Sequence, residues 1–198
     1  MQNYRPKTGI PPAVKTIISI NVVMYLLSEF IDRRFGGNTA AHWFGLHIPQ
    51  STYWQPWQYI THMFMHGGLT HIFFNMFAVY MFGRVLEMVW GAKRFVIFYL
   101  ICGIGAGALN SAIGWFEARN LLEQYEAFKN TPEPALLAEF IQNQIAHPAA
   151  WVWEVVDNWT NNPDSPSYIE AGKQLFRKVI EEKIDIPMVG ASGAVFGI

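Results

Sequence analysis

The chain has 198 residues, of which 52% are hydrophobic, 16% aromatic and only 15% charged. Soluble domains carry roughly 25% charged residues, and disordered chains combine low hydrophobicity with high charge, so this composition excludes disorder. A net charge of −1 without a basic patch argues against nucleic-acid binding, and the single cysteine excludes an internal disulfide framework or a cysteine-based metal cluster.

The acidic residues divide the chain into two unlike parts. Only Glu29, Asp32 and Glu87 precede residue 117, and the other twelve acidic residues lie between Glu117 and Asp185. The first part is therefore apolar and slightly basic, whereas the second is polar and acidic. This asymmetry indicates membrane contact on one side of the molecule and water on the other.

Three apolar segments are long enough to cross a membrane, because about 20 helical residues span a hydrocarbon core of roughly 30 Å. They cover residues 16–31, 69–86 and 95–116. No small-residue cleavage site follows the first segment, so we expect a spanning helix rather than a signal peptide. In the third segment Gly103, Gly107 and Ser111 recur every four residues, which favours close packing within a bundle over dimerisation through this face.

The loop between the first two spans, residues 32–68, differs from a soluble loop. Tyr53, Trp54 and Trp57 are typical of an aromatic belt at a membrane interface. Residues 60–69 are apolar but too short to span, so we expect this loop to lie in the interface or to re-enter the membrane.

Residues 117–186 contain two stretches with helical periodicity. The sequence Thr131–Glu133 is typical of one helix start, and Ser167 with Glu170 forms a capping-box pattern for another. Apolar residues then recur on one face of each stretch: Leu137, Phe140, Ile141 and Ile145, followed by Leu175, Phe176, Val179 and Ile180. We therefore expect an acidic insert of amphipathic helices outside the bilayer.

Polar side chains within the apolar segments carry the functional signal, because they are costly in a membrane unless they face a cavity or a partner. His71 and Asn75 are four residues apart and share one face of the second span. His62 and His66 have the spacing of two zinc ligands on a helix. However, Met63 stands where the metalloprotease motif has glutamate, so we expect no metal site.

Ser192 lies in the sequence Gly-Ala-Ser-Gly at residues 190–193, where a fourth apolar helix is expected to start within residues 187–198. The hydrolase pattern G-x-S-x-G has a second glycine where this chain has Ala194. From these residues alone, Ser192 is equally well interpreted as a small packing residue or as a nucleophile.

In combination, the motifs resemble the rhomboid family of intramembrane serine proteases. The pattern W-x4-H-x3-H-x4-H-x3-N is spelled by Trp57, His62, His66, His71 and Asn75. The resemblance covers residues 13–116 and 187–198 and leaves the insert outside. It implies an all-α polytopic membrane helix bundle in three parts. These are residues 1–116 with three spans and the loop at 32–68, the amphipathic insert at 117–186, and the start of the fourth span at 187–198.

The resemblance implies catalytic roles for the residues that match the family's motifs. Ser192 is the expected nucleophile, and His71 and Asn75 are expected to donate hydrogen bonds to the oxyanion. Gly190 is expected to let the backbone approach the substrate. Gly193 is expected to let a neighbouring helix come close to the serine.

The resemblance also implies a loop-organising role for Trp57, His62 and His66. Gln58 follows Trp57 where the family has arginine, which removes a charge expected to face the lipid. The resemblance implies no cofactor. The expected partners are transmembrane protein substrates and the lipid bilayer.

The family takes its general base from a histidine on a later helix. The 198-residue chain is therefore expected to be an inactive N-terminal fragment of an active serine endopeptidase. The alternative is a rhomboid-like pseudoprotease that binds membrane helices without cleaving them. A transporter or channel subunit is a third interpretation, which predicts more intramembrane polar residues than His71 and Asn75.

Basic residues indicate the topology. Three of them precede the first span, and Arg84, Lys93 and Arg94 lie between the second and third spans. By the positive-inside rule both segments are cytoplasmic. We therefore expect a multi-pass protein of the cell (inner) membrane, with a cytoplasmic N-terminus and the insert on the outer side.

Overall fold

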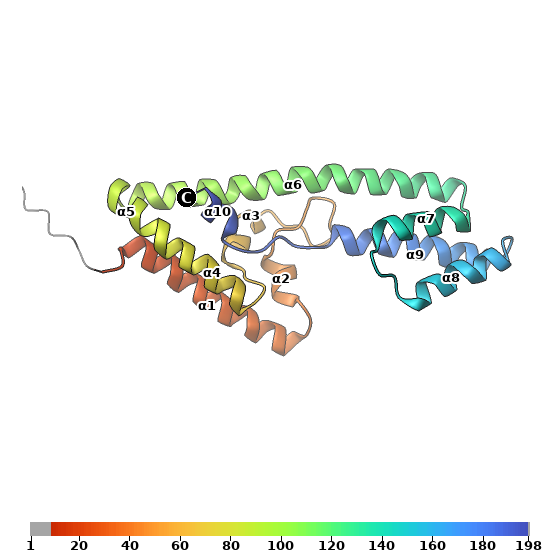
Figure 1. Cartoon of the computed structure of the whole chain (residues 1–198), viewed down its shortest axis with the longest axis horizontal. Coiled ribbons are helices and arrows are strands. Elements are labelled where there is room, and N and C mark those ends of the chain that lie inside the picture. Colours follow the sequence, from red (N-terminus) through yellow and green to blue (C-terminus); the bar gives the residue numbers. More distant parts are fainter. Residues whose placement is uncertain (1–8, 198) are drawn as a thin grey trace, which may run out of the picture. The chain divides into compact units, whose positions relative to one another are not determined.

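The computed structural model describes residues 9–197 and consists of helices joined by short connections (Figure 1). In chain order these are α1 (Pro12–Phe35), α2 (Thr39–Phe44), α3 (Gln58–Thr61), the 3-10 turn η1 (His62–Phe64), α4 (Leu69–Ala78), the π-helical turn η2 (Val79–Gly83), α5 (Arg84–Trp90), α6 (Ala92–Asn130), α7 (Pro134–Gln144), α8 (Ala150–Asn161), α9 (Pro166–Ile184) and α10 (Ser192–Phe196). The described residues contain no strand, only an isolated antiparallel bridge between Leu46 and Met188. Arg5 and Lys7, which contribute to the predicted topology, lie outside the described residues, as does Ile198.

The chain divides into two compact units. The bundle unit comprises the described residues up to His47, then Tyr53–Ser111, and the residues from Pro187 onward. The insert unit comprises Ile48–Thr52 and Ala112–Ile186. Helix α6 contributes to both units, so the predicted division at residues 116 and 117 falls within a single helix.

The three predicted spans are confirmed, together with the all-α membrane bundle that they imply. Three continuous helical segments are long and apolar enough to cross a membrane: Pro12–Phe35, Leu69–Trp90 and Ala92–Asn130. At 1.5 Å per residue the 39 residues of α6 measure about 58 Å, almost twice the hydrocarbon thickness. The C-terminal half of α6 therefore serves as the first helix of the insert unit.

A buried carboxylate connects the end of the second span to the start of the first. α1 begins at Pro12 without a side-chain cap of its own. Instead, Glu87 of α5 accepts hydrogen bonds from the backbone N–H groups of Ala13 at 2.9 Å and Val14 at 2.8 Å. These N–H groups have no partner within the helix, and a negative charge is favourable at a helix N-terminus. Glu87 thus caps α1, which lies beside α4 (Figure 1).

Glycines let the bundle elements approach α6 closely. A Cβ at Gly103 would overlap the side chain of Met63, and one at Gly107 would lie 2.9 Å from Leu46 Cδ2 and 3.1 Å from His62 Cε1. The loop that precedes α4 therefore packs directly on this face of α6. The predicted close packing of Gly103 and Gly107 within the bundle is confirmed.

The insert unit has a hydrophobic core of its own. The predicted apolar faces of α7 and α9 are buried there, together with residues of α6 and α8: Phe128, Leu137, Phe140, Ile141, Val152, Val156, Trp159, Leu175, Phe176, Val179 and Ile180. Phe140 stacks on Phe176 with ring centroids 3.6 Å apart. The predicted amphipathic helical insert is thereby confirmed.

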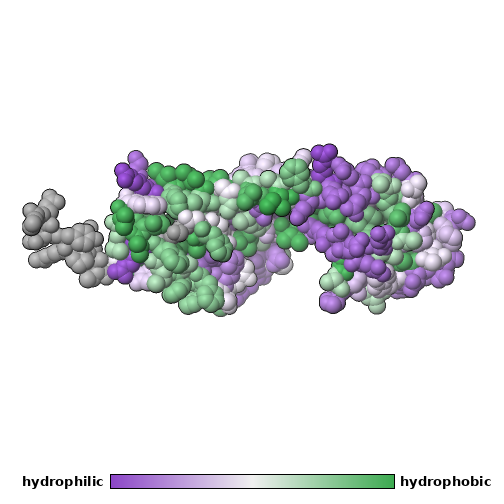
Figure 2. Space-filling model, turned by 45° about the horizontal axis from the view of Figure 1, so that its top comes forward, coloured by the Kyte–Doolittle hydropathy of each residue, from purple (hydrophilic) through white to green (hydrophobic). Residues whose placement is uncertain are grey.

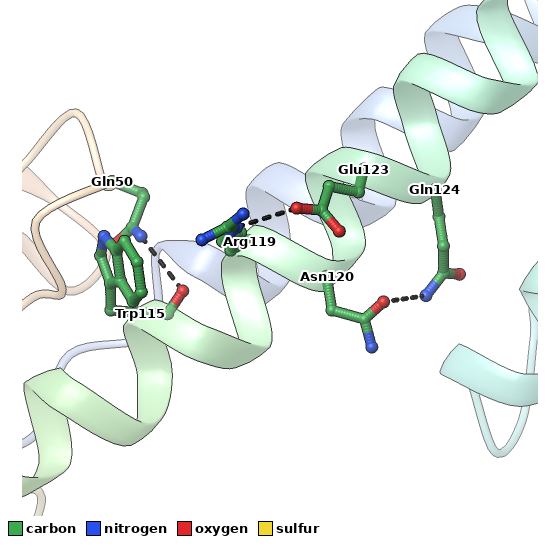
Figure 3. Close-up of polar contacts among 6 residues, drawn as sticks. All are labelled: Gln50, Trp115, Arg119, Asn120, Glu123 and Gln124. Atoms are coloured by element: carbon green, nitrogen blue, oxygen red, sulfur yellow. Dashed lines mark hydrogen bonds and ion pairs between the residues drawn. The ribbon is translucent and has the colours of Figure 1, made fainter.

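Polar contacts along α6 stabilise the exposed face of the insert unit (Figure 3). Arg119 Nε donates to Glu123 Oε1 at 2.8 Å, one helical turn away. Gln50 Nε2 donates to the carbonyl oxygen of Trp115 at 3.2 Å and attaches the short segment 48–52 to this helix. Exposed pairs of this kind contribute roughly 0.3–0.5 kcal/mol each.

Both predicted helix starts in the insert are wrong by two residues. α7 begins at Pro134 after Glu133, not at Pro132, because α6 continues to Asn130 and its last turn occupies the preceding residues. α9 begins at Pro166 after Ser165, so Ser167 lies inside the first turn rather than capping it. In both helices proline takes the first position, where its missing N–H costs nothing.

The surfaces of the two units differ in polarity. Figure 2 shows hydrophobic residues over much of the bundle unit and hydrophilic residues over most of the insert unit. Among the large exposed apolar side chains of the spans are Val23, Leu26, Phe30, Phe73, Phe74, Val89, Ile101 and Leu109. In water this apolar surface is unfavourable, whereas a bilayer accommodates it. The protein is a multi-pass membrane protein.

Candidate active site

Gln58 is the centre of the loop between α1 and α4. It is fully buried, and its Oε1 accepts hydrogen bonds from the backbone N–H groups of His47 at 3.2 Å and Gln55 at 3.0 Å. Its Nε2 donates to the carbonyl oxygens of Tyr53 at 2.9 Å and His42 at 3.3 Å. A single amide therefore satisfies four backbone groups of a loop whose only helical elements, α2, α3 and η1, are short.

His62 is buried in η1, one turn after Gln58. Its Nδ1 lies 2.8 Å from the Gln58 carbonyl oxygen, and since a carbonyl only accepts, Nδ1 carries the proton. Its Nε2 has no hydrogen-bond partner among the residues that the structure describes. Burial lowers the pKa of His62, so the ring is neutral near pH 7.

His66 is buried beside His71, with ring centroids 5.1 Å apart and an interplanar angle of 66°. Burial, and secondly the proximity of His71, lower the pKa of His66 to about 4. A protonated His66 would place a positive charge in a poorly solvated position beside His71. His66 therefore fills space as a neutral ring near pH 7.

The segment before Ser192 is fixed to this loop by three backbone hydrogen bonds. Leu46 N–H donates to Met188 O at 2.9 Å, and Met188 N–H donates to Leu46 O at 2.8 Å. Two residues later, Gly190 N–H donates to the carbonyl oxygen of His62 at 2.9 Å. Residues distant in the sequence are thereby held in one place without a sheet.

Gly190 faces the polar side of α4. A Cβ at Gly190 would lie 2.7 Å from His71 Nε2 and 3.5 Å from Asn75 Nδ2, and its φ of +115° is a conformation that other residues rarely adopt. Glycine is required here for both reasons. The contact also shows that the sequence around Ser192 lies against His71 and Asn75.

The tautomer of His71 follows from its other nitrogen. Gly67 N–H donates to His71 Nδ1 at 3.4 Å, so Nδ1 is the acceptor and a neutral ring carries its proton on Nε2. The Nε2–H group is then a donor on the side of Gly190. Asn75 is buried, and its Nδ2 has no hydrogen-bond partner among the described residues. The Asn75 amide, unpartnered among the described residues, and the His71 Nε2–H group thus lie on one face of α4.

Ser192 shares a cavity with Asn75. The cavity has a volume of about 470 Å³, and its walls are apolar apart from these two side chains: Phe74, Ala78, Phe82, Val195 and Phe196. Ser192 is half-buried and is the first residue of α10. The geometry therefore brings Ser192, Asn75 and, through Gly190, His71 together.

The remaining predicted site residues are close to this group or at its edge. A Cβ at Gly193 would lie 2.6 Å from Ala106 Cβ, so its absence lets α10 pack on α6. Trp57 is half-exposed at the loop surface, and its Nε1 donates to the Trp43 carbonyl oxygen at 3.3 Å.

The sequence did not reveal the importance of Gln58. It stood out only as a replacement for the family's arginine, and no pattern in the chain indicates that its side chain turns inward. Its contact groups are backbone atoms, which carry no sequence signal.

The fold and the site together define a class: a polytopic helical membrane protein with a serine and an amide at one cavity, and an imidazole against the glycine two residues before the serine. A comparison with protein families matches residues 53–119 to the Rhomboid domain. This range includes Trp57, His62, His66, His71 and Asn75 and ends before Ser192. Over residues 53–119, about a third of its length, the chain is similar to the rhomboid family.

Curated relatives carry the same family name. Over 107 residues the chain is 26% identical to the rhomboid protease GlpG of Serratia proteamaculans. This match covers 54% of this chain and 36% of that protein. Over 57 residues it is 40% identical to RHOMBOID-like protein 6, mitochondrial, of Arabidopsis thaliana, covering 29% of this chain and 19% of that protein. Over 55 residues it is 42% identical to Rhomboid-related protein 3 of Homo sapiens, covering 28% of this chain and 13% of that protein. The matches thus cover about a third or less of these relatives.

Proposed function

We propose that the chain supplies the nucleophile and the oxyanion donors of an intramembrane serine endopeptidase. The observation that carries this proposal is the Asn75 amide, which is buried, has an unpartnered donor among the described residues, and lines the same cavity as Ser192. A buried donor without a partner costs about 1–3 kcal/mol, a cost that is offset where a ligand or a reacting group accepts the hydrogen bond.

In the proposed reaction Ser192 Oγ attacks the carbonyl carbon of a peptide bond. A C–O bond forms, the carbonyl π electrons move onto oxygen, and the serine proton passes to a base. The oxyanion accepts hydrogen bonds from Asn75 Nδ2–H and His71 Nε2–H, groups that are already in position before the charge develops. Collapse expels the amine, which takes a proton, and water then hydrolyses the acyl-enzyme.

We propose that the general base is a histidine outside the described residues. In this proposal His71 is a hydrogen-bond donor, and a ring that donates from Nε2 cannot at the same time accept the serine proton there. Among residues 9–197 the cavity lining contains neither an imidazole nor a carboxylate. On this proposal the 198-residue chain by itself is inactive.

The proposed substrates are membrane proteins with a single span. The cavity beside Ser192 has apolar walls, including Phe74 and Phe196, which suit a helix arriving from the lipid phase. Hydrolysis needs water, so we place the site toward the outer face of the cell membrane, where an unstable substrate helix can unwind. The basic residues Arg84, Lys93 and Arg94 then face the cytoplasm, and the insert lies outside.

The test is labelling of the protein that contains the downstream histidine by a fluorophosphonate in proteoliposomes, followed by peptide mapping. We expect the label on Ser192, its loss in Ser192→Ala, and its retention in Ser28→Ala, a buried serine whose hydroxyl donates to Tyr25 O within α1. A folded protein that contains a downstream histidine and yet remains unlabelled would contradict the proposed nucleophile. Cleavage of a single-span substrate by the isolated 198-residue chain would contradict the proposed location of the base.

The pseudoprotease alternative gives a different pattern in the same experiment. It predicts that a single-span substrate still binds, measured by crosslinking, while Ser192 is not labelled and Ser192→Ala has no effect on binding. The unpartnered Asn75 donor favours the protease because it lines the same cavity as Ser192, as an oxyanion donor must.

A further inference from the structure

Gln58 uses the whole hydrogen-bonding capacity of its side chain. An amide offers two N–H donors and an oxygen with two lone pairs. In this protein both donors go to the carbonyl oxygens of His42 and Tyr53, and the oxygen accepts from the N–H groups of His47 and Gln55. The side chain is fully buried, so water does not replace any of these partners.

This contact set selects an amide over the other polar side chains. An ionised glutamate would place oxygen against the carbonyls of His42 and Tyr53, where only donors are favourable. Arginine and lysine have no acceptor for the N–H groups of His47 and Gln55. Asparagine is one methylene shorter and does not reach both ends of the loop.

A short chain of hydrogen bonds leads from Gln58 to the candidate site. The Gln58 carbonyl oxygen accepts from His62 Nδ1 at 2.8 Å, and the His62 carbonyl oxygen accepts from Gly190 N–H at 2.9 Å. Gly190 in turn lies directly against His71 and Asn75. A displacement of the loop at Gln58 therefore moves the backbone two residues before Ser192.

We propose that Gln58 is a positioning residue for the candidate site: its buried amide sets the loop that holds Gly190 through His62. Its effect on hydrolysis rests on the proposed function, but its effect on the Gly190 backbone does not. Gln58 touches neither the reacting serine nor the oxyanion donors. Its loss should therefore alter the geometry of catalysis rather than remove a reacting group.

The test compares Gln58→Leu and Gln58→Glu with Gln55→Leu. Gln55 is three residues away and exposed, and its part in the contact is its backbone N–H, so its side chain is a matched control. In the protein that contains the downstream histidine, we expect both Gln58 variants to lower kcat for a single-span substrate about tenfold or more at similar KM, because small misplacements of reacting groups cost this much. Gln55→Leu should retain the wild-type kcat.

A pH series separates positioning from general destabilisation. Protonation of the Gln58→Glu carboxyl restores one donor, so its kcat relative to wild type should rise as the pH is lowered, whereas that of Gln58→Leu should not. Thermal midpoints are measured on the same samples. Wild-type kcat in folded Gln58→Leu, or an equal loss in Gln55→Leu, would overturn the proposal.

Hydrogen exchange provides a readout that does not depend on catalysis. The amides of Met188 and Gly190 should exchange faster in both Gln58 variants than in wild type or Gln55→Leu. Unchanged exchange there contradicts the positioning role even if the protein is a protease. Faster exchange in a protein that Ser192-directed probes never label supports the positioning role while rejecting the proposed function.

Discussion

At the scale of single residues, the site combines polar atoms that stability alone does not explain. Asn75 Nδ2 has no partner within residues 9–197, although its side chain is only 6% exposed. His71, by contrast, has its tautomer set by Gly67. A fixed hydrogen-bond donor without a partner is typical of catalytic sites, where it can stabilise charge that develops in the transition state.

Replacing Asn75 should therefore separate stability from activity. We expect Asn75→Leu to keep or raise the thermal midpoint, because it removes an unsatisfied buried donor. In the protein that contains the downstream histidine, it should lower kcat about 100-fold, because the proposed oxyanion donor is lost. Asn21→Leu is the matched control, since Asn21 is equally buried in a span and its Nδ2 donates to Ile17 O. That variant should keep the wild-type kcat. A clear fall in the midpoint of Asn75→Leu would mean that Asn75 stabilises the fold.

His66 should make stability depend on pH. Its pKa is about 4 in the folded protein and 6.5 in a solvated chain, so the unfolded state binds the proton first as the pH falls. Stability should be constant above about pH 6.5, fall by at most about 3 kcal/mol between pH 6.5 and 4, and level off below that range. Thermal midpoints in detergent across this range measure the effect.

The control for this pH dependence is a second histidine. His66→Gln should flatten the curve, whereas His147→Gln, which changes an exposed residue of the insert unit, should leave it as in wild type. Equal slopes in wild type and His66→Gln would show that His66 is already protonated, or solvated, in the folded state. Burial also lowers the pKa of His62. Any pH dependence of stability that remains in His66→Gln, with the same sign, is therefore assigned to His62.

At the scale of elements, the long apolar runs were predictable and their ends were not. A run such as residues 95–116 identifies a span from composition alone. The continuation of α6 to Asn130 depends on packing of Phe128 against Trp159 and Phe176. These contacts form only in the folded protein, so the local sequence does not indicate where α6 ends. Gln58 shows the same limit for the site, because its partners are carbonyl and N–H groups of a folded loop.

Two glycines of α6 provide a matched test of the close packing on the loop. A Cβ at Gly107 would lie 2.9 Å from Leu46 Cδ2, whereas one at Gly105 meets nothing within 4 Å. Gly107→Ala should destabilise the bundle unit by about 1–3 kcal/mol through overpacking. Gly105→Ala should be neutral or slightly stabilising, because alanine is the better helix former. Unfolding in mixed micelles compares the two, and equal effects would rule out the tight contact at Gly107.

At the scale of the whole molecule, two compact units with separate cores share one chain. The combination of Ser192 with residues of the second span was predictable only through the family resemblance. Spacing along the chain does not bring residue 192 near residue 71. The backbone bonds that do so, from Leu46 to Met188 and from His62 to Gly190, involve no characteristic side chain.

Separate cores predict separate responses to mutation. Trp159 is 1% exposed and fills the insert core against Phe128 and Gly172. Trp159→Ala should destabilise the insert unit by about 3–5 kcal/mol, because it leaves a large cavity. Fluorophosphonate labelling of Ser192 should be unchanged. Loss of labelling in step with unfolding of the insert would show that the two units are thermodynamically coupled.

The π-helical turn η2 has a consequence for how the second span distributes its buried polar groups. Twelve residues separate Asn75 from Glu87, and at about 100° per residue a regular α-helix would rotate them roughly 120° apart. A π-helical turn accommodates about one additional residue, which reduces the rotation to roughly 20°. Asn75 and Glu87 therefore lie on nearly the same face of the second span. The Asn75 amide lines the cavity, and the Glu87 carboxylate caps the start of α1. Straightening the helix at Val79–Gly83 would turn one of them toward lipid.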